Sequence, residues 1–472
     1  MNVDELLDLD LTAIAGLIRK RKVSSLEVTR ACLNRIERVQ PIINCFIRIE
    51  AEAALKAARK ADAALAKGKA LGPLHGVPLA HKDMFYRAGH VTTCGSKIRR
   101  DFVPTEDCTA LSRLLDAGSL YVGGLNMAEF AIGPTGHNIH HGHCRNPWNP
   151  DHVTGGSSSG SGSAVAARAV FGALGSDTGG SVRLPASMCG VVGMKPTTGL
   201  VSRFGAMPLS FTLDTIGPLT RSVRDNARLL RLISGPDPAD PTTVQAKPAN
   251  PEAGLDEGAK GLKIGVPKSY FFDVASAEVR ALYDESLAVF RKLGAKIVEV
   301  EIPDMARLTQ LSNLVLAAEA ATRHARWLVE RPGDHQPQVR QRLETGLFVP
   351  AVTYLQALDA RAAMLEEFCA RALTKADILA VPGMPFAVPR VDETDVGGNP
   401  AAADMVARIS WCTRVANYLG VPALTIPCGF TGNHLPSGLQ LIGRPFAEPL
   451  LYRAAAAFER EVDFASNRPP II

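Results

Sequence analysis

Two segments rich in glycine and serine constrain this chain more than any other feature of its sequence. They are residues 155–163 and 175–181, and a short, largely apolar, helix-like stretch, 164–173, separates them. Glycine adopts backbone dihedral angles that other residues avoid, so such segments can turn several N–H groups toward one point. Converging N–H groups bind an anion, or the oxyanion that develops during acyl transfer. The two segments therefore predict an anion-binding loop beside serine hydroxyls rather than a flexible linker.

The composition indicates a folded chain and argues against several classes of protein. Of its 472 residues, 46% are hydrophobic and 21% are charged, which favours a sizeable core over disorder. The formal net charge is only +5, and the one basic cluster, residues 19–22, follows an amphipathic stretch, so a nucleic-acid surface is not expected. No apolar run approaches about 18 residues, so a membrane span is not expected either.

Cysteine usage and the first residues both point to a reducing compartment. The nine cysteines are odd in number and form no Cys-x-x-Cys pair, which predicts reduced thiols. The N-terminus is acidic and lacks the apolar segment of a secretion signal. We therefore expect a cytoplasmic protein.

Strands and helices are expected to alternate along the chain. A capping box at Ser24 and Glu27 predicts the start of one helix. The alternation predicts a single three-layer α/β/α domain over residues 1–472 with a central mixed sheet. Residues 235–260 indicate a long surface connection, and the helical region 305–372 is expected to help shape the substrate pocket. The expected strands are 76–80, 120–124, 262–267, 296–300, 378–381 and 423–426.

Ser181 is the candidate nucleophile. It directly follows Thr178, Gly179 and Gly180, whose backbone N–H groups can face the oxygen of a bound carbonyl. No histidine accompanies this loop, so a lysine is the alternative base. Lys82 fits because apolar residues flank it, and burial disfavours the ammonium form and leaves a neutral amine that can accept a proton.

A competing nucleophile is Ser158. Residues 156–160 fit the Gly-x-Ser-x-Gly nucleophile elbow with Ser158 at the centre. That motif should connect a strand to a helix, whereas the preceding residues 146–150 indicate turns. The elbow interpretation is therefore the weaker of the two.

A cluster of histidines lies upstream of the serine segments. His137, His140, His141 and His143, with Cys144, are residue types that bind zinc. They lie in a loop rich in glycine and proline, and no other metal-ligand motif accompanies them. The cluster is therefore interpreted as a polar loop near the substrate, and no metal or organic cofactor is expected.

Taken together, the motifs resemble the amidase signature family of serine hydrolases. The resemblance covers nearly the whole chain and is densest from about residue 75 to residue 220, the signature core. The matching segments are 76–78 with Lys82 and Asp83, 155–158, 174–183, 189–197, 213–218, 420–423 and 438–443.

This resemblance implies a Ser-cisSer-Lys triad. Ser181 matches the family nucleophile, Ser157 the bridging serine on a cis peptide, and Lys82 the terminal base. It selects Ser157 over Ser158, which the residues alone do not. It also implies that residues 178–181 form the oxyanion loop. Further supporting or substrate-contacting residues are expected at Ser158, Asp177, Arg183, His141, Met207 and Phe211.

The chain departs from the family pattern at three places. Ser159 replaces a glycine of the serine loop, and residues 140–142 read His-His-Gly where His-Tyr-Gly is common. A Pro-Thr-x-Pro segment is replaced by residues 382–385. The last two changes are expected to touch the acyl pocket and so to affect the choice of substrate.

Two functions follow from the resemblance. The first is a free-standing hydrolase of a carbon–nitrogen amide bond, acting on a small aryl or apolar amide, without nucleic acid, membrane or cofactor and with a homodimer left open. The alternative is the A subunit of a tRNA-dependent amidotransferase, which uses the same triad to release ammonia from glutamine. The small net charge favours the first.

Overall fold

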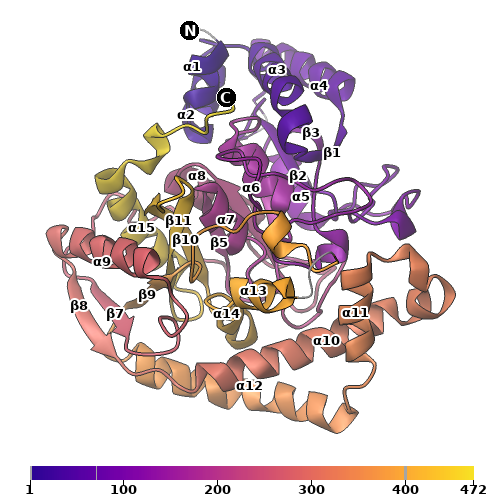
Figure 1. Ribbon diagram of the computed structural model, residues 1–472. Coiled ribbons are helices and arrows are strands. Elements are labelled where there is room, and N and C mark those ends of the chain that lie inside the picture. The colour runs from indigo at the N-terminus through magenta and orange to yellow at the C-terminus, as the bar shows by residue number, and fades with distance from the viewer. Residues whose placement is uncertain (1–2, 71, 398–400) are drawn as a thin grey trace.

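Two β-sheets with helices around them build the molecule (Figure 1). The computed structural model describes residues 3–70, 72–397 and 401–472. Over these residues the larger sheet has eight strands in the order β4-β6-β5-β10-β11-β9-β7-β8, and the smaller has three in the order β1-β3-β2. The strands are β1 Phe46–Ile49, β2 Pro78–Lys82, β3 Leu120–Leu125, β4 Gly172–Asp177, β5 Val192–Lys195, β6 Thr215–Thr220, β7 Lys263–Pro267, β8 Lys296–Val300, β9 Ile378–Pro382, β10 Ala423–Phe430 and β11 Pro436–Ile442.

Both sheets are mixed. In the larger sheet β7 runs parallel to both of its neighbours, β8 and β9. Every other pair of neighbouring strands, from β4 to β9 in the order of the sheet, is antiparallel. In the smaller sheet β2 is parallel to β3, and β1 is antiparallel to it. The predicted α/β class with a mixed central sheet is confirmed. The sequence did not indicate that the strand ending in Lys82 belongs to a separate sheet.

Helices surround the sheets. Helices α10, α11 and α12 lie along the lower side of Figure 1, with α13 and α14 above them. Helices α1–α4 lie at the top. The helices are α1 Val3–Asp8, α2 Leu11–Arg19, α3 Ser25–Ile43, α4 Ala51–Ala66, α5 Thr109–Asp116, α6 Ser159–Ala166, α7 Arg183–Cys189, α8 Val223–Ile233, α9 Ala277–Lys292, α10 Met305–Glu330, α11 Pro337–Gly346, α12 Ala351–Ala372, α13 Ala402–Ile409, α14 Arg414–Leu419 and α15 Glu448–Val462.

The start of α3 shows how local sequence sets an element. Ser24 Oγ accepts a hydrogen bond from Glu27 N at 3.1 Å, and the Glu27 carboxylate accepts one from Ser24 N at 2.8 Å. These bonds satisfy N–H groups that the first turn of a helix leaves unpaired. The predicted capping box is therefore present, and the following positions Val28, Cys32 and Ile36 are buried on one helix face.

The centre of the molecule is built from the two glycine–serine segments. All residues of α6 and α7 are buried, the two short helices pack against each other, and α6 also packs against β4. Small side chains make this close packing feasible, since an added Cβ at Gly160 would lie 2.3 Å from the Cys45 carbonyl oxygen. The segment expected as a loop, 175–181, begins inside β4, so the irregular part is only residues 178–182.

The connection between α8 and β7 is long and has little regular structure. Residues 234–262 consist of turns and irregular backbone. Among the described residues, no helix is long and apolar enough to cross a membrane.

Candidate active site

Lys82 and two serines meet at the junction of the two sheets. Lys82 is the last residue of β2, and its Nζ lies 2.7 Å from Ser157 Oγ and 2.8 Å from Ser176 Oγ. Ser157 precedes α6 and follows a cis peptide bond after Gly156, and Ser176 belongs to β4. All three side chains are buried.

Burial controls the charge of Lys82. Removal of the amine from water lowers the pKa of Lys82 from 10.5 to about 7, although the carboxylates of Asp214 and Asp177 oppose this shift. A neutral amine can therefore be populated near neutral pH. Such an amine can accept a proton from the neighbouring Ser157 hydroxyl.

His81, next to Lys82, makes a hydrogen bond between the two sheets. Its Nδ1 accepts a hydrogen bond from Leu174 N of β4 at 3.1 Å. Burial, assisted by Arg87, lowers the pKa of His81 to about 3, so the ring is neutral and can act as an acceptor. The sequence assigned no role to this histidine, because its partner Leu174 lies 93 residues further along the chain.

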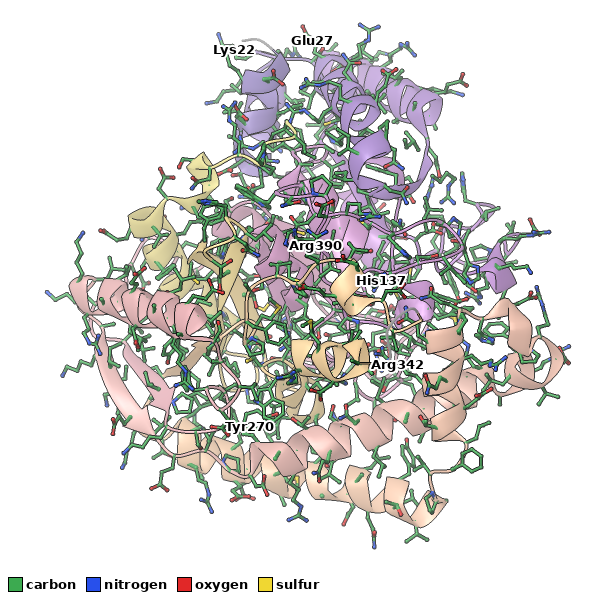
Figure 2. All side chains as sticks on the ribbon, viewed as in Figure 1. Lys22, Glu27, His137, Tyr270, Arg342 and Arg390 are labelled. Atoms are coloured by element: carbon green, nitrogen blue, oxygen red, sulfur yellow. The ribbon has the colours of Figure 1, made fainter. Side chains whose placement is uncertain are left out.

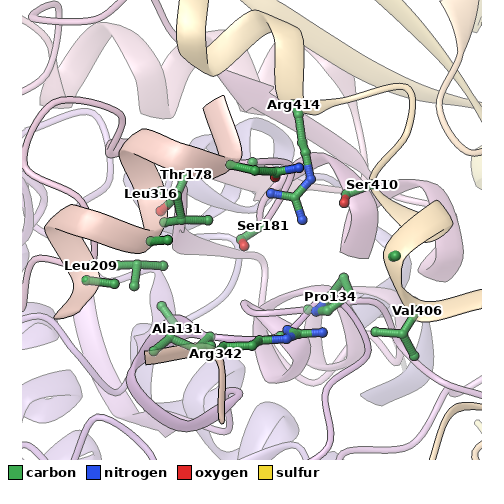
Figure 3. Close-up of a pocket in the computed structure, with 18 of the residues that line it drawn as sticks. Ala131, Pro134, Thr178, Ser181, Leu209, Leu316, Arg342, Val406, Ser410 and Arg414 are labelled. Carbon is green, nitrogen blue, oxygen red and sulfur yellow. The ribbon is translucent and has the colours of Figure 1, made fainter. Parts of the chain in front are cut away.

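Ser181 lies between β4 and α7 and lines a cavity of about 270 Å³ (Figure 3). Gly156, Thr178 and Gly179 line the same cavity. Ser158 N donates a hydrogen bond to Ser181 O at 3.3 Å and so joins the two glycine–serine segments. The structure thus brings together the segments that carry Ser181, Ser157 and Lys82.

Asp177 and Arg183 form a buried ion pair beneath this loop. Arg183 Nη2 and Nε lie 2.8 and 3.0 Å from the two Asp177 carboxylate oxygens, and both side chains have no exposed area. Burial would raise the pKa of Asp177, but the Arg183 guanidinium and the Asn417 amide outweigh it and hold that pKa below its usual range. The Gly180 N–H donates to the Asp177 carboxylate at 2.8 Å. Asp177, Arg183 and Gly180 N–H are therefore engaged in holding the loop.

Asp214 supports the same loop from the other side. Its carboxylate accepts hydrogen bonds from Thr178 Oγ1 at 2.5 Å, Leu209 N at 2.8 Å and Ser210 N at 3.0 Å. Burial raises the pKa of Asp214 to about 6, and these hydrogen bonds limit the rise. The sequence placed Asp214 in a matching motif without a role, since only the fold brings residue 214 to residue 178.

Three predicted pocket residues lie elsewhere. Met207 and Phe211 line a second cavity, of about 200 Å³, together with Ser176 and Asp214. His141 is in a loop outside the lining of the Ser181 cavity, where its backbone N–H donates to Asn138 Oδ1 at 3.0 Å. None of the three is among the residues that line the Ser181 cavity. Apolar character alone does not tell which cavity a side chain faces.

The histidine loop is held by ordinary polar contacts. His137 Nε2 lies 2.8 Å from Thr394 Oγ1, near the segment that carries Arg390 (Figure 2), and His140 Nε2 lies 3.0 Å from Glu129 Oε1. Within the described part of the chain, no group of three or more His, Cys, Asp or Glu side chains is arranged to hold a metal ion.

Helices distant in sequence complete the Ser181 cavity. Arg342 of α11 and Arg414, the first residue of α14, reach into it together with Ser410 and apolar residues such as Leu316 of α10 (Figure 3). Leu316 and Arg342 belong to the helical region 305–372, from which pocket residues were expected. Neither arginine was recognised from the sequence, because neither belongs to a motif.

Comparison with known proteins decides the family. The family model for amidases matches residues 27–452. The chain belongs to the amidase family. It is accordingly an enzyme that hydrolyses linear carbon–nitrogen amide bonds, and its architecture is the amidase-signature fold.

Relatives and solved structures match over almost the full chain. The A subunit of the glutamyl-tRNA(Gln) amidotransferase of Moorella thermoacetica is 40% identical over 99% of both chains. The solved structure of the corresponding protein from Thermotoga maritima is 33% identical with a TM-score of 0.79, covering 98% of this chain and 94% of that chain. A structure from a vestigial protein complex, reported in connection with the origins of an s-triazine catabolic enzyme, is 34% identical with a TM-score of 0.88, covering 96% and 98%.

These relatives correct one expectation from the sequence. We expected a chain that handles a small amide without any nucleic-acid partner, because its net charge is small. That expectation is wrong, since relatives matched over almost their whole length are subunits of an amidotransferase named for a tRNA. The net charge of one subunit says little about an assembly, because the surface that contacts a nucleic acid can belong to another subunit.

Proposed function

We propose that this chain is the amide-hydrolysing A-type subunit of an assembly like the glutamyl-tRNA amidotransferase, and that it releases ammonia from a small amide donor such as glutamine. The contact between Lys82 Nζ and Ser157 Oγ, next to the cavity that Ser181 lines, carries this proposal. The relatives, matched over their full length, favour the amidotransferase subunit over a free-standing hydrolase.

In the first half of the reaction, Ser181 Oγ attacks the amide carbonyl carbon. Its proton passes to Ser157, which gives its own to the neutral amine of Lys82. The tetrahedral oxyanion is stabilised by backbone N–H groups of the loop 178–181 other than that of Gly180, which donates to the Asp177 carboxylate. The carbon–nitrogen bond then breaks, and the leaving nitrogen takes a proton from Lys82 through Ser157, so ammonia leaves and an acyl-enzyme remains.

In the second half, a water molecule attacks the acyl-enzyme. The same relay takes a proton from the water and returns one to Ser181 Oγ, which releases the carboxylic acid. The second serine bound to Lys82, Ser176, holds the amine in place between the two sheets. Each proton that Lys82 accepts is returned within one cycle, so the enzyme ends as it began.

The first experiment tests the nucleophile. The Ser181→Ala variant should release no ammonia from an amide donor and should not be labelled by a serine-directed acylating probe. Ser163→Ala is the matched control, because Ser163 Oγ donates to the Arg145 carbonyl oxygen at 2.9 Å and does not line the cavity. Labelling that persists in Ser181→Ala would move the nucleophile to another serine.

The second experiment tests the assembly. The chain is combined with the companion subunits of a bacterial glutamyl-tRNA amidotransferase, and amidation of glutamyl-tRNA is followed with glutamine as donor. Amidation that depends on Ser181 supports the proposed role. A chain that hydrolyses amides alone but never supports amidation contradicts it. The nine unpaired cysteines support a reducing, cytoplasmic setting for such an assembly.

A further inference from the structure

Two guanidinium groups approach the Ser181 cavity from opposite sides. In Figure 3, Arg414 lies above Ser181 and Arg342 below it, and both side chains extend along the cavity. A Cβ added to Gly179 would lie 3.4 Å from Arg414 Nη1, so this guanidinium lies against the loop that precedes the nucleophile. Positive charge therefore stands on both sides of the space where the acyl part of a substrate must lie.

Neither guanidinium has a counter-ion within the described residues. No ion pair joins Arg342 or Arg414 to a carboxylate there, whereas Arg340, two residues before Arg342 on α11, pairs with Glu344 at 3.1 Å. Burial, together with the like charge of Arg342, lowers the pKa of Arg414 to about 10. Two cations beside an apolar wall repel each other unless an anion lies between them.

A buried hydroxyl points to the same ligand chemistry. Ser410, directly after α13, is 2% exposed and lines the cavity beside Arg414 (Figure 3). Among the described residues its Oγ has no hydrogen-bond partner. A buried hydroxyl without a partner is costly, and a ligand oxygen that accepts a hydrogen bond from it removes that cost.

The cavity offers no negative charge to a cationic substrate. The described residues that line it include neither Asp nor Glu. The nearby buried Glu319 is engaged by Ser210 Oγ, Thr212 and Tyr354 Oη. Residues 398–400, outside the described part, are Gly, Asn and Pro and carry no carboxylate.

We propose that the cavity selects amides whose acyl part ends in a carboxylate, bound by Arg342, Arg414 and Ser410, and that it needs no ammonium group beside that carboxylate. This selectivity rests on the proposed amide hydrolysis at Ser181 and names its donor class. Glutamine belongs to the class through its carboxylate, but its ammonium gains no ion pair in the cavity and meets two positive charges.

The test compares three amides of equal chain length. They are glutaramate, which is glutamine without its amino group, glutamine itself, and the neutral pentanamide. We expect kcat/KM for glutaramate to exceed that for pentanamide by about 10- to 100-fold, the range for hydrogen bonds to a charged group. Glutamine should not exceed glutaramate. Equal turnover of pentanamide and glutaramate, or a clear preference for glutamine, would overturn the inference.

Variants assign the selectivity to residues. Arg342→Met and Arg414→Met should each lower kcat/KM for glutaramate about 10-fold or more relative to any change for pentanamide, mainly through KM. Ser410→Ala should act in the same direction with a smaller effect. Arg340→Met is the matched control, because that side chain pairs with Glu344 outside the cavity. Equal losses for both amides would contradict a carboxylate site.

A binding measurement separates this inference from the proposed function. Glutarate, the hydrolysis product of glutaramate, is titrated into the Ser181→Ala protein by calorimetry. Binding that both arginine substitutions weaken supports the carboxylate site even if no tested amide is hydrolysed. Failure of the proposed function would instead appear as hydrolysis that persists in Ser181→Ala. Absence of glutarate binding to this folded protein would overturn the carboxylate site alone.

Discussion

The charged residues beneath the loop that carries Ser181, residues 178–182, are paired, whereas those on the helical wall of the cavity, formed in part by α11 and α14, are not. Beneath the loop, Arg183 and Asp177 are fully buried and paired with each other. On the wall, Arg342 and Arg414 face the cavity, and within the described residues neither has a carboxylate partner. Charges that hold a structure are neutralised inside it, whereas charges left open at a cavity are available to a ligand. On our proposals, this difference separates residues that hold the loop of Ser181 in place from residues that select the substrate.

Among the variants that test this comparison, the largest expected effect on activity comes from removing the proposed base. Lys82→Ala should lower kcat by about 10²- to 10⁴-fold, since general-base catalysis contributes about that much. In the unmodified enzyme, kcat should rise from acid pH to a plateau above about pH 7, because the pKa of Lys82 is lowered to about 7. Both are measured by ammonia release under conditions where chemistry limits the rate. A flat pH profile between pH 5 and 9 would argue against a neutral lysine.

The second prediction concerns stability rather than rate. Asp177→Asn leaves the buried Arg183 unpaired and should lower the free energy of unfolding by about 3–5 kcal/mol, measured by denaturant titration. The folded pKa of Asp177 is lowered, so the pair stabilises the fold above the unfolded carboxyl pKa of about 3.9 and loses this effect as pH falls below it. The variant should therefore show a weaker loss of stability on acidification.

The matched comparison for that prediction is Arg342→Met on the wall. Because its guanidinium pairs with no carboxylate of the described chain, its removal should change the unfolding free energy little, by about 0.5 kcal/mol or less. If Arg342→Met destabilised the fold as much as Asp177→Asn, the contrast between the two regions would fail.

A smaller effect on kcat than that of Lys82→Ala concerns the contact between Asp214 and Thr178. Asp214→Asn and Thr178→Val should each lower kcat about tenfold or less, because they loosen the loop without removing a reacting group. If the hydrogen bond between them is the cause, the double variant should be no worse than the poorer single variant. Additive losses would show that the two residues act independently.

How much of the structure the sequence could predict depends on how far apart along the chain the interacting residues lie. The strand 296–300 was predicted with the bounds that β8 has, since the signal lies within five residues. The loop that carries Ser181 was likewise singled out from a local glycine pattern, and its role in catalysis stays a prediction. By contrast, Arg342 and Arg414 meet Ser181 only because α11 and α14 are folded over the loop, and no local pattern records this. Phe211 lines the second cavity, and its expected contact with a substrate stays a prediction.

The position of Lys82 has a consequence for how this enzyme loses activity. Lys82 belongs to the small sheet, while Ser176 belongs to the large one, and the His81–Leu174 hydrogen bond is part of what keeps the two in register. A relative shift of about 1 Å can reduce a rate about 100-fold, although it leaves each sheet intact. Activity therefore reports on the relative position of the two sheets. At low denaturant concentrations, the enzyme should lose activity before circular dichroism shows any loss of secondary structure.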